Sequence, residues 1–91
     1  MRMSEWFMLC EERRDDDGCV IDVDQMFYTT YRGDIHDDSV LDDIIIKCLE
    51  FRQSEIPGVD VNRLTIRVYD ENSDLIAFYD FDEKEWCHIL W

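Results

Sequence analysis

The second half of the chain has the most regular pattern of hydrophobic and polar positions. Leu64, Ile66 and Val68 alternate with Thr65 and Arg67, which is the period of a half-buried β-strand. Similar short runs follow, separated by the polar turns at 72–73 and 82–85. The pattern predicts three sequential strands, at Leu64–Tyr69, Leu75–Phe81 and Trp86–Trp91. Three strands joined by short turns form an antiparallel meander.

The segment before the meander has helical periodicity. Its apolar residues recur at the spacing that places them on one face of a helix from about Ser39 to Glu55. The expected buried stripe consists of Val40, Leu41, Ile44, Ile45, Cys48 and Leu49. Pro57-Gly58 ends the helix, because proline cannot continue it.

Acidic residues mark the start of this helix. Asp38 or Ser39 can cap it, and Asp42 occupies the capping-box position for a cap at Ser39. Asp43 and Lys47, four residues apart, can form an ion pair on the solvent side.

The N-terminal part of the chain predicts a β-hairpin. Two apolar runs, Glu5–Cys10 and Cys19–Val23, flank a polar insert that contains Asp17-Gly18. Glycine accepts the positive φ that tight hairpin turns require. We therefore expect Asp15, Asp16 and Asp17 at the tip of the hairpin.

Gln25–Arg32 fits two structures. Its β-branched and aromatic residues favour a strand, whereas Met26, Phe27, Thr30 and Tyr31 also fit one face of a helix. We favour a strand, as a possible third one after the hairpin. The predicted fold class is α+β, an antiparallel sheet (N-terminal hairpin plus C-terminal three-stranded meander) packed against one main α-helix.

Composition indicates a folded domain with an unusual charge. The 91 residues include 23 acidic and nine basic side chains, which give a formal net charge of −14. Hydrophobic residues make up 46% and aromatic residues 13% of the chain, too much for a disordered acidic tail. We expect one domain over residues 1–91, with a modest core.

The four cysteines, Cys10, Cys19, Cys48 and Cys87, are widely spaced. The apolar run from Trp6 to Cys10 is too short for a signal sequence or a membrane span. We therefore expect a cytoplasmic chain whose cysteines are reduced and act as small core residues.

Negative charge gathers in three clusters. Glu11–Asp24 contains seven acids with two arginines, Asp34–Asp43 contains five acids, and Asp70–Glu85 contains seven acids with one lysine. Most of these acids fall in predicted turns or at the helix start. The candidate partner-binding residues are Asp15, Asp16, Asp17, Asp34, Asp37, Asp38, Asp42, Asp43, Asp70, Glu71, Asp74, Asp80, Asp82, Glu83, Glu85 and Trp86.

Such clusters can imitate nucleic acid. Carboxylates two residues apart on a strand, as predicted for Asp22 with Asp24 and for Asp80 with Asp82, lie about 6.6 Å apart on one face. That spacing is comparable to the distance between neighbouring charges of a phosphate backbone. Aromatic residues near the meander could anchor a complex, and the candidates are Tyr69, Tyr79, Trp86 and Trp91. The alternative is that they fill the core or cover the sheet.

Other kinds of site are poorly supported. Asp15, Asp17 and Asp24 have part of the spacing of an EF-hand loop, but Arg13 occupies its first ligand position. The cysteines and histidines lack the close pairs of a zinc site. His36 and Ser39 belong to no catalytic constellation. We expect neither enzymatic activity nor a cofactor, and a charge of −14 would repel a nucleic-acid substrate.

In size, acidity and α+β character, the whole chain resembles the phage-encoded DNA-mimic inhibitors of host defence, the anti-CRISPR and anti-restriction proteins. The resemblance involves no sequence motif, so it assigns no role to any residue. It implies a non-enzymatic inhibitor in a bacterial host that blocks a basic nucleic-acid-binding protein, such as a nuclease or CRISPR effector. Two alternatives remain open, an immunity protein or antitoxin against a basic nuclease toxin, and an acidic scaffold subunit without mimicry.

Overall fold

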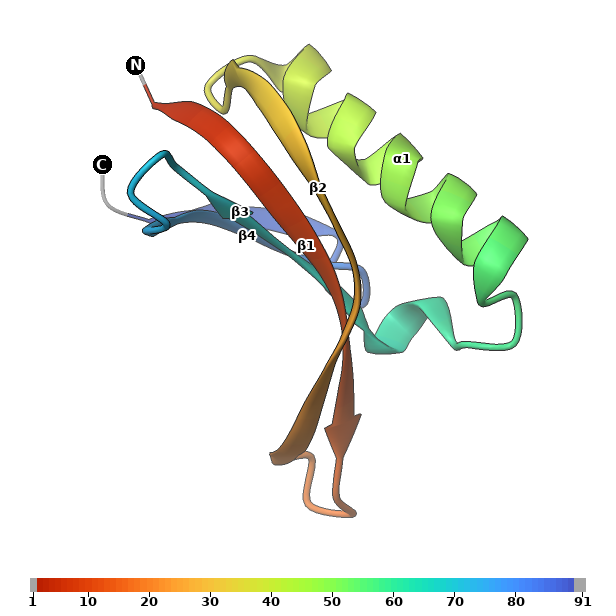
Figure 1. Cartoon of the computed structure of the whole chain (residues 1–91). Helices are drawn as coiled ribbons and strands as arrows, with labels where there is room; N and C mark the ends of the chain where they lie inside the picture. Colours follow the sequence, from red (N-terminus) through yellow and green to blue (C-terminus); the bar gives the residue numbers. More distant parts are fainter. Residues whose placement is uncertain (1, 90–91) are drawn as a thin grey trace.

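An antiparallel sheet of five strands lies against one long helix in the computed structural model, which describes residues 2–89 (Figure 1). The strand order is β2-β1-β3-β4-β5. The strands are β1 (Met3–Arg14), β2 (Val20–Asp34), β3 (Leu64–Tyr69), β4 (Leu75–Asp80) and β5 (Glu85–His88). The helix α1 spans Asp38–Glu55, and a short 3-10 helix, η1, spans Val61–Arg63. The α+β class, the N-terminal hairpin and the C-terminal meander are confirmed.

The hairpin extends beyond the rest of the sheet. The pairing of β1 with β3 reaches only as far as Glu11 opposite Leu64, whereas β1 and β2 continue together to Arg14 and Val20. The result is a two-stranded arm that projects from the sheet (Figure 1). Its tip is the predicted turn, with Gly18 at a φ of +83°.

Gln25–Arg32 is a strand, as favoured, but the expectation of a separate third strand is wrong. This segment continues the second hairpin strand, so β2 is 15 residues long. The register shifts at three places, and at each of them β2 holds one residue more than β1. Such bulges twist an edge strand and hinder pairing with other chains. The bulges therefore protect β2, a long edge strand without proline, from such pairing.

The helix begins one residue earlier than predicted. Its cap is Asp37, whose carboxylate accepts hydrogen bonds from the backbone N–H and the hydroxyl of Ser39 at 3.0 and 2.7 Å. The assignment of the cap to Asp38 or Ser39 was therefore wrong, and Asp42 lies too far along the helix for a capping box. The helix ends at Glu55, just before Pro57-Gly58, as predicted.

One face of the sheet and one face of α1 enclose the core. Phe7 and Leu9 of β1, with Ile66 of β3 and Ile44 of α1, are fully buried in it. The predicted helix stripe is correct for Leu41, Ile44 and Cys48, whereas Leu49 is exposed because it lies at the margin of the stripe.

The cysteines divide into two pairs. All four lie within the described residues and are free thiols. Cys10 and Cys48 are buried, as expected of core cysteines. Cys19 and Cys87 are exposed, so that expectation is wrong for them: Cys19 lies next to the hairpin turn and Cys87 on an edge strand.

The meander agrees with the prediction except at two ends. β4 stops at Asp80, although the N–H of Phe81 still donates to the carbonyl of Leu64 at 3.2 Å. β5 covers Glu85–His88, and residues 90 and 91 of the predicted last strand lie outside the described residues.

Candidate binding surface

The aspartate that opens each acidic turn stabilises the turn itself. In every case one carboxylate oxygen accepts a backbone N–H from two to four residues ahead at about 3 Å, which is an Asx-type turn. These turn-capping residues are Asp15, Asp34, Asp37, Asp70 and Asp80. Turn chemistry is thus one physical reason why aspartates gather at the turns.

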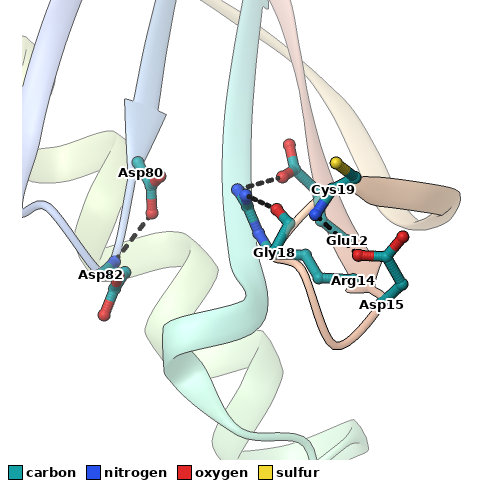
Figure 2. A network of polar contacts seen from close by, with 7 residues as sticks. All are labelled: Glu12, Arg14, Asp15, Gly18, Cys19, Asp80 and Asp82. Atoms are coloured by element: carbon teal, nitrogen blue, oxygen red, sulfur yellow. Dashed lines mark hydrogen bonds and ion pairs between the residues drawn. The ribbon is translucent and has the colours of Figure 1, made fainter.

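Two of these turns are drawn in Figure 2. The figure shows Asp15 accepting a hydrogen bond from the N–H of Cys19 and Asp80 accepting one from the N–H of Asp82. Asp15 also accepts one from the N–H of Asp17. The prediction that Asp80 and Asp82 stand side by side on a strand is therefore wrong. Asp82 lies in the turn after β4, because the carboxylate of Asp80 folds the chain there.

The remaining turn acids project into solvent. They follow a capping aspartate within the same turn and are exposed. This exposed set comprises Asp16, Asp17, Glu71, Asp74, Asp82 and Glu83, and Asp38 and Glu85 are exposed as the first residues of α1 and β5. Rigid turns therefore hold these carboxylates outside the sheet.

The fold brings two separate acidic turns together at the start of β1. The carbonyl of Arg2 accepts a hydrogen bond from the N–H of Ile35 at 3.0 Å, and its guanidinium lies 3.8 Å from the carboxylate of Asp70. Arg2 thus links the turn before α1 with the turn between β3 and β4. We call this surface the acidic end; it comprises Asp34, Asp37, Asp38, Asp70, Glu71 and Asp74.

The predicted cluster Asp70–Glu85 is split by the structure. Its second half, in the turn between β4 and β5, lies at the opposite end of β4 from Asp70. There Asp82 shares a hollow of about 420 Å³ with Arg13, Arg14 and Arg63. We call the β4–β5 turn and the hairpin arm the mixed end; its candidate acids are Asp15, Asp16, Asp17, Asp80, Asp82, Glu83 and Glu85.

Arginines of the hairpin arm are paired with neighbouring acids. Arg13 lies 2.6 Å from Asp24, and Arg14 lies 3.0 Å from Glu12 and donates to the carbonyl of Gly18 (Figure 2). The hydrogen bond that Arg13 donates to the carboxylate of Asp24 raises the pKa of this arginine. Asp22 and Asp24 do share one face of β2, as predicted, but the arginine opposite Asp22 neutralises part of their charge.

Asp42 and Asp43 differ in how they present their charge. Asp42 is exposed, whereas Asp43 is half-buried and accepts a hydrogen bond from the hydroxyl of Tyr31 at 2.7 Å. Burial, together with this hydrogen bond, raises the pKa of Tyr31 to about 12. The expected pairing of Asp43 with Lys47 is replaced by this contact, which ties the helix to β2.

The predicted aromatic anchors lie in different environments. Tyr79 and Trp86 are in contact, with ring centroids 5.0 Å apart, and pack on the core beneath α1. Tyr69 instead stacks against Trp6 at 4.1 Å, and Trp91 lies outside the described residues. We did not predict a role for Trp6, although its position next to the buried Phe7 on a strand indicated that it faces away from the core.

Comparisons of this chain with known proteins gave no match. No protein-family model matches it, and no curated protein or solved structure shows significant similarity to it. Its function must therefore be inferred from its own surfaces.

Two further observations concern residues 2–89. No group of three or more histidine, cysteine, aspartate or glutamate side chains there is arranged to hold a metal ion. None of the helices in the same part of the chain is long and apolar enough to cross a membrane.

Proposed function

We propose that this protein is a non-enzymatic inhibitor that mimics nucleic acid and occupies the basic nucleic-acid-binding surface of a defence effector, such as a CRISPR complex or restriction nuclease. The observation that supports this most strongly is the acidic end. There Arg2 contacts two turns, one through its backbone carbonyl and one through its guanidinium, and these two turns carry six carboxylates.

The acidic end suits a phosphate-binding protein. Such proteins contact the nucleic-acid backbone through lysine and arginine, and this electrostatic term supplies much of their affinity. Carboxylates held at fixed positions can meet the same cations. The net charge of −14 would also accelerate the encounter with a basic partner.

Rigid turns lower the cost of binding. The capping aspartates fix the backbone of each turn through hydrogen bonds of about 3 Å, so the neighbouring Asp38, Glu71 and Asp74 are held in place before a partner arrives. A surface ordered in advance loses less conformational entropy on association. The second oxygen of Asp34 and that of Asp37 can also meet a cation, whereas that of Asp70 faces Arg2.

Affinity capture from a bacterial lysate, restricted to proteins that heparin retains, tests the proposal. The bait is the wild-type protein, and the comparison is a variant in which the six acids of the acidic end are replaced by their amides. Asparagine still forms Asx turns, so the variant loses charge and keeps its turns. We expect the wild type to enrich basic nucleic-acid-binding proteins, which duplex DNA then releases.

A second variant controls for overall charge. It carries amides at six acids of the mixed end: Asp15, Asp16, Asp17, Asp82, Glu83 and Glu85. We expect this variant to retain most of the capture. If duplex DNA released none of the captured proteins, or if both variants captured as well as the wild type, mimicry by the acidic end would be refuted.

A further inference from the structure

The face of the sheet opposite α1 has an aromatic surface. Because side chains alternate along a strand, the residues between the buried core positions point to this face. The register places Met8 beside Tyr28 on one side and Arg67 on the other, with Phe78 next to Arg67. Within residues 2–89, no helix lies on this open face (Figure 1).

Tyr28 and Trp6 make this face unusual. Tyr28 is 65% exposed, which makes it one of the most exposed large hydrophobic side chains in the described residues. A shallow hollow of about 240 Å³ lies between Trp6, Tyr28, Thr29 and Thr30. The ring of Tyr69, opposite Trp6 on β3, stacks on the ring of Trp6 at an interplanar angle of 12°.

Carboxylates lie on the same face. Asp80 pairs with Thr65 and with Glu85 in the ladder, so the alternation that places Phe78 on the open face also places Asp80 there. Glu12 follows Met8 at an even spacing on β1 and is 8% exposed. The open face thus has aromatic rings on β1 and β2 and the carboxylate of Asp80 on β4, with Arg67 between them and Glu12 paired with Arg14.

We propose that this open face is a docking site for an arginine-bearing segment of the basic partner, which lies across the strands so that one guanidinium group stacks on Tyr28 and Trp6 and another pairs with Asp80. This rests on the proposed function and adds to it the place where the partner is anchored. Arginine stacks well on aromatic rings and forms hydrogen bonds with carboxylates at the same time.

Two features favour this occupant over others. A single-stranded nucleic acid could stack its bases on such rings, but a chain with a net charge of −14 repels phosphates. A second copy of the chain would bring the same negative charge against this face. A cationic segment satisfies both the aromatic rings and the carboxylates.

The test uses nona-arginine as the probe and follows the amide signals of the ¹⁵N-labelled protein by NMR. We expect chemical-shift changes along β1, β2 and β3 on the open face, including Met8, Tyr28 and Tyr69. Tyr28→Ala should weaken binding about 2- to 5-fold. Tyr28→Leu should weaken it similarly, because leucine keeps apolar area but lacks the ring face.

Ile46→Ala is the matched control, because Ile46 is 50% exposed on the outer side of α1. It should bind nona-arginine like the wild type. Tyr28 is largely exposed, so its variants should remain folded, which circular dichroism verifies.

The outcomes separate this inference from the proposed function. If the shifts were confined to the acidic end and Tyr28→Ala bound normally, this docking site would be refuted and the proposed function would stand. If nona-arginine did not bind at all, or if an oligothymidine strand bound the open face in its place, both would be refuted.

Discussion

Aspartates at the turns of this protein serve two purposes at the scale of single residues. A capping aspartate such as Asp70 accepts two backbone N–H groups, from Asn72 and Asp74, at 2.9 and 3.0 Å. The acids that follow it, such as Glu71, are exposed and contribute charge. Stability and binding therefore depend on different members of the same cluster, and substitutions can separate them.

Asp70→Ala should destabilise the protein while Asp70→Asn should not. Alanine leaves two turn N–H groups without their acceptor, which we expect to cost about 1–2 kcal/mol. Asparagine keeps the acceptor and loses only the weak ion pair with Arg2, worth about 0–1 kcal/mol. Urea denaturation measures both. Equal stability of the two variants would show that the Asp70 carboxylate does not hold this turn.

Tyr31 should make the protein sensitive to alkaline pH. Burial and the hydrogen bond to Asp43 raise its pKa from 10.0 to about 12 in the folded state. A tyrosine is harder to ionise in the folded state when its pKa is raised, so its contribution to stability is complete below pH 10. That contribution is lost as the pH rises from about 10 to about 12.

Tyr31→Phe should therefore reduce the loss of stability between pH 9 and pH 11.5, measured by urea denaturation. Burial also raises the pKa of the Cys48 thiol to about 12, but this thiol is present in both proteins and cancels in the comparison. Tyr28→Phe, at an exposed position, is the control. An unchanged pH dependence in Tyr31→Phe would contradict the assignment to Tyr31.

At the scale of elements, α1 is held to the sheet by a narrow stripe. Ile44 is fully buried and Leu41 is 6% exposed, whereas Ile46 on the same helix is 50% exposed. The helix therefore packs on the sheet through one side only, and within residues 2–89 no helix covers the opposite face of the sheet.

Ile44→Ala should cost about 2–5 kcal/mol, because it opens a cavity beneath the helix. Ile46→Ala removes the same atoms from an exposed position and should change stability by less than about 0.5 kcal/mol. Comparing their denaturation midpoints tests whether α1 is oriented as described. A similar loss in both variants would contradict this orientation.

The sequence predicted well the features that a local residue pattern determines. It predicted less well the strand limits that depend on contacts between strands or within turns. The stripe of α1 and the glycine of the hairpin turn are local signals. Whether Gln25–Arg32 forms its own strand depends on bulges against β1, and bulges leave no periodic pattern. Similarly, the end of β4 depends on the turn cap that Asp80 forms, which a strand pattern does not reveal.

The candidate site was predictable in its residues but not in its arrangement. Counting acids found the clusters, and turn signals placed them outside the sheet. That the Asp34–Asp38 turn and the Asp70–Asp74 turn lie at the same end of the sheet could not be predicted without the strand order, because β1 inserts between β2 and β3. The stacking of Trp6 on Tyr69 required the same pairing of β1 with β3.

At the scale of the whole molecule, charge is distributed unevenly. At the acidic end two turns meet around Arg2, whereas at the mixed end Arg13, Arg14 and Arg63 lie among the acids. Like charges crowded on a small domain destabilise it. Much of this repulsion should originate at the acidic end.

Added salt should therefore stabilise the protein by screening that repulsion. We expect Tm to rise between 20 mM and 500 mM NaCl, and to rise less in the variant with six amides at the acidic end. The variant with six amides at the mixed end removes the same formal charge and should keep more of the salt dependence. Identical slopes for both variants would show that the two ends contribute equally to repulsion.

Competition for a DNA-binding partner tests the central claim most directly. A protein captured from the heparin-retained fraction is bound to a fluorescent DNA duplex, and its displacement by the acidic protein is followed by fluorescence anisotropy. We expect the wild type and the mixed-end variant to displace the duplex, and the acidic-end variant to require at least about tenfold higher concentration. Equal potency of the two variants, or no displacement by the wild type, would contradict nucleic-acid mimicry by the acidic end.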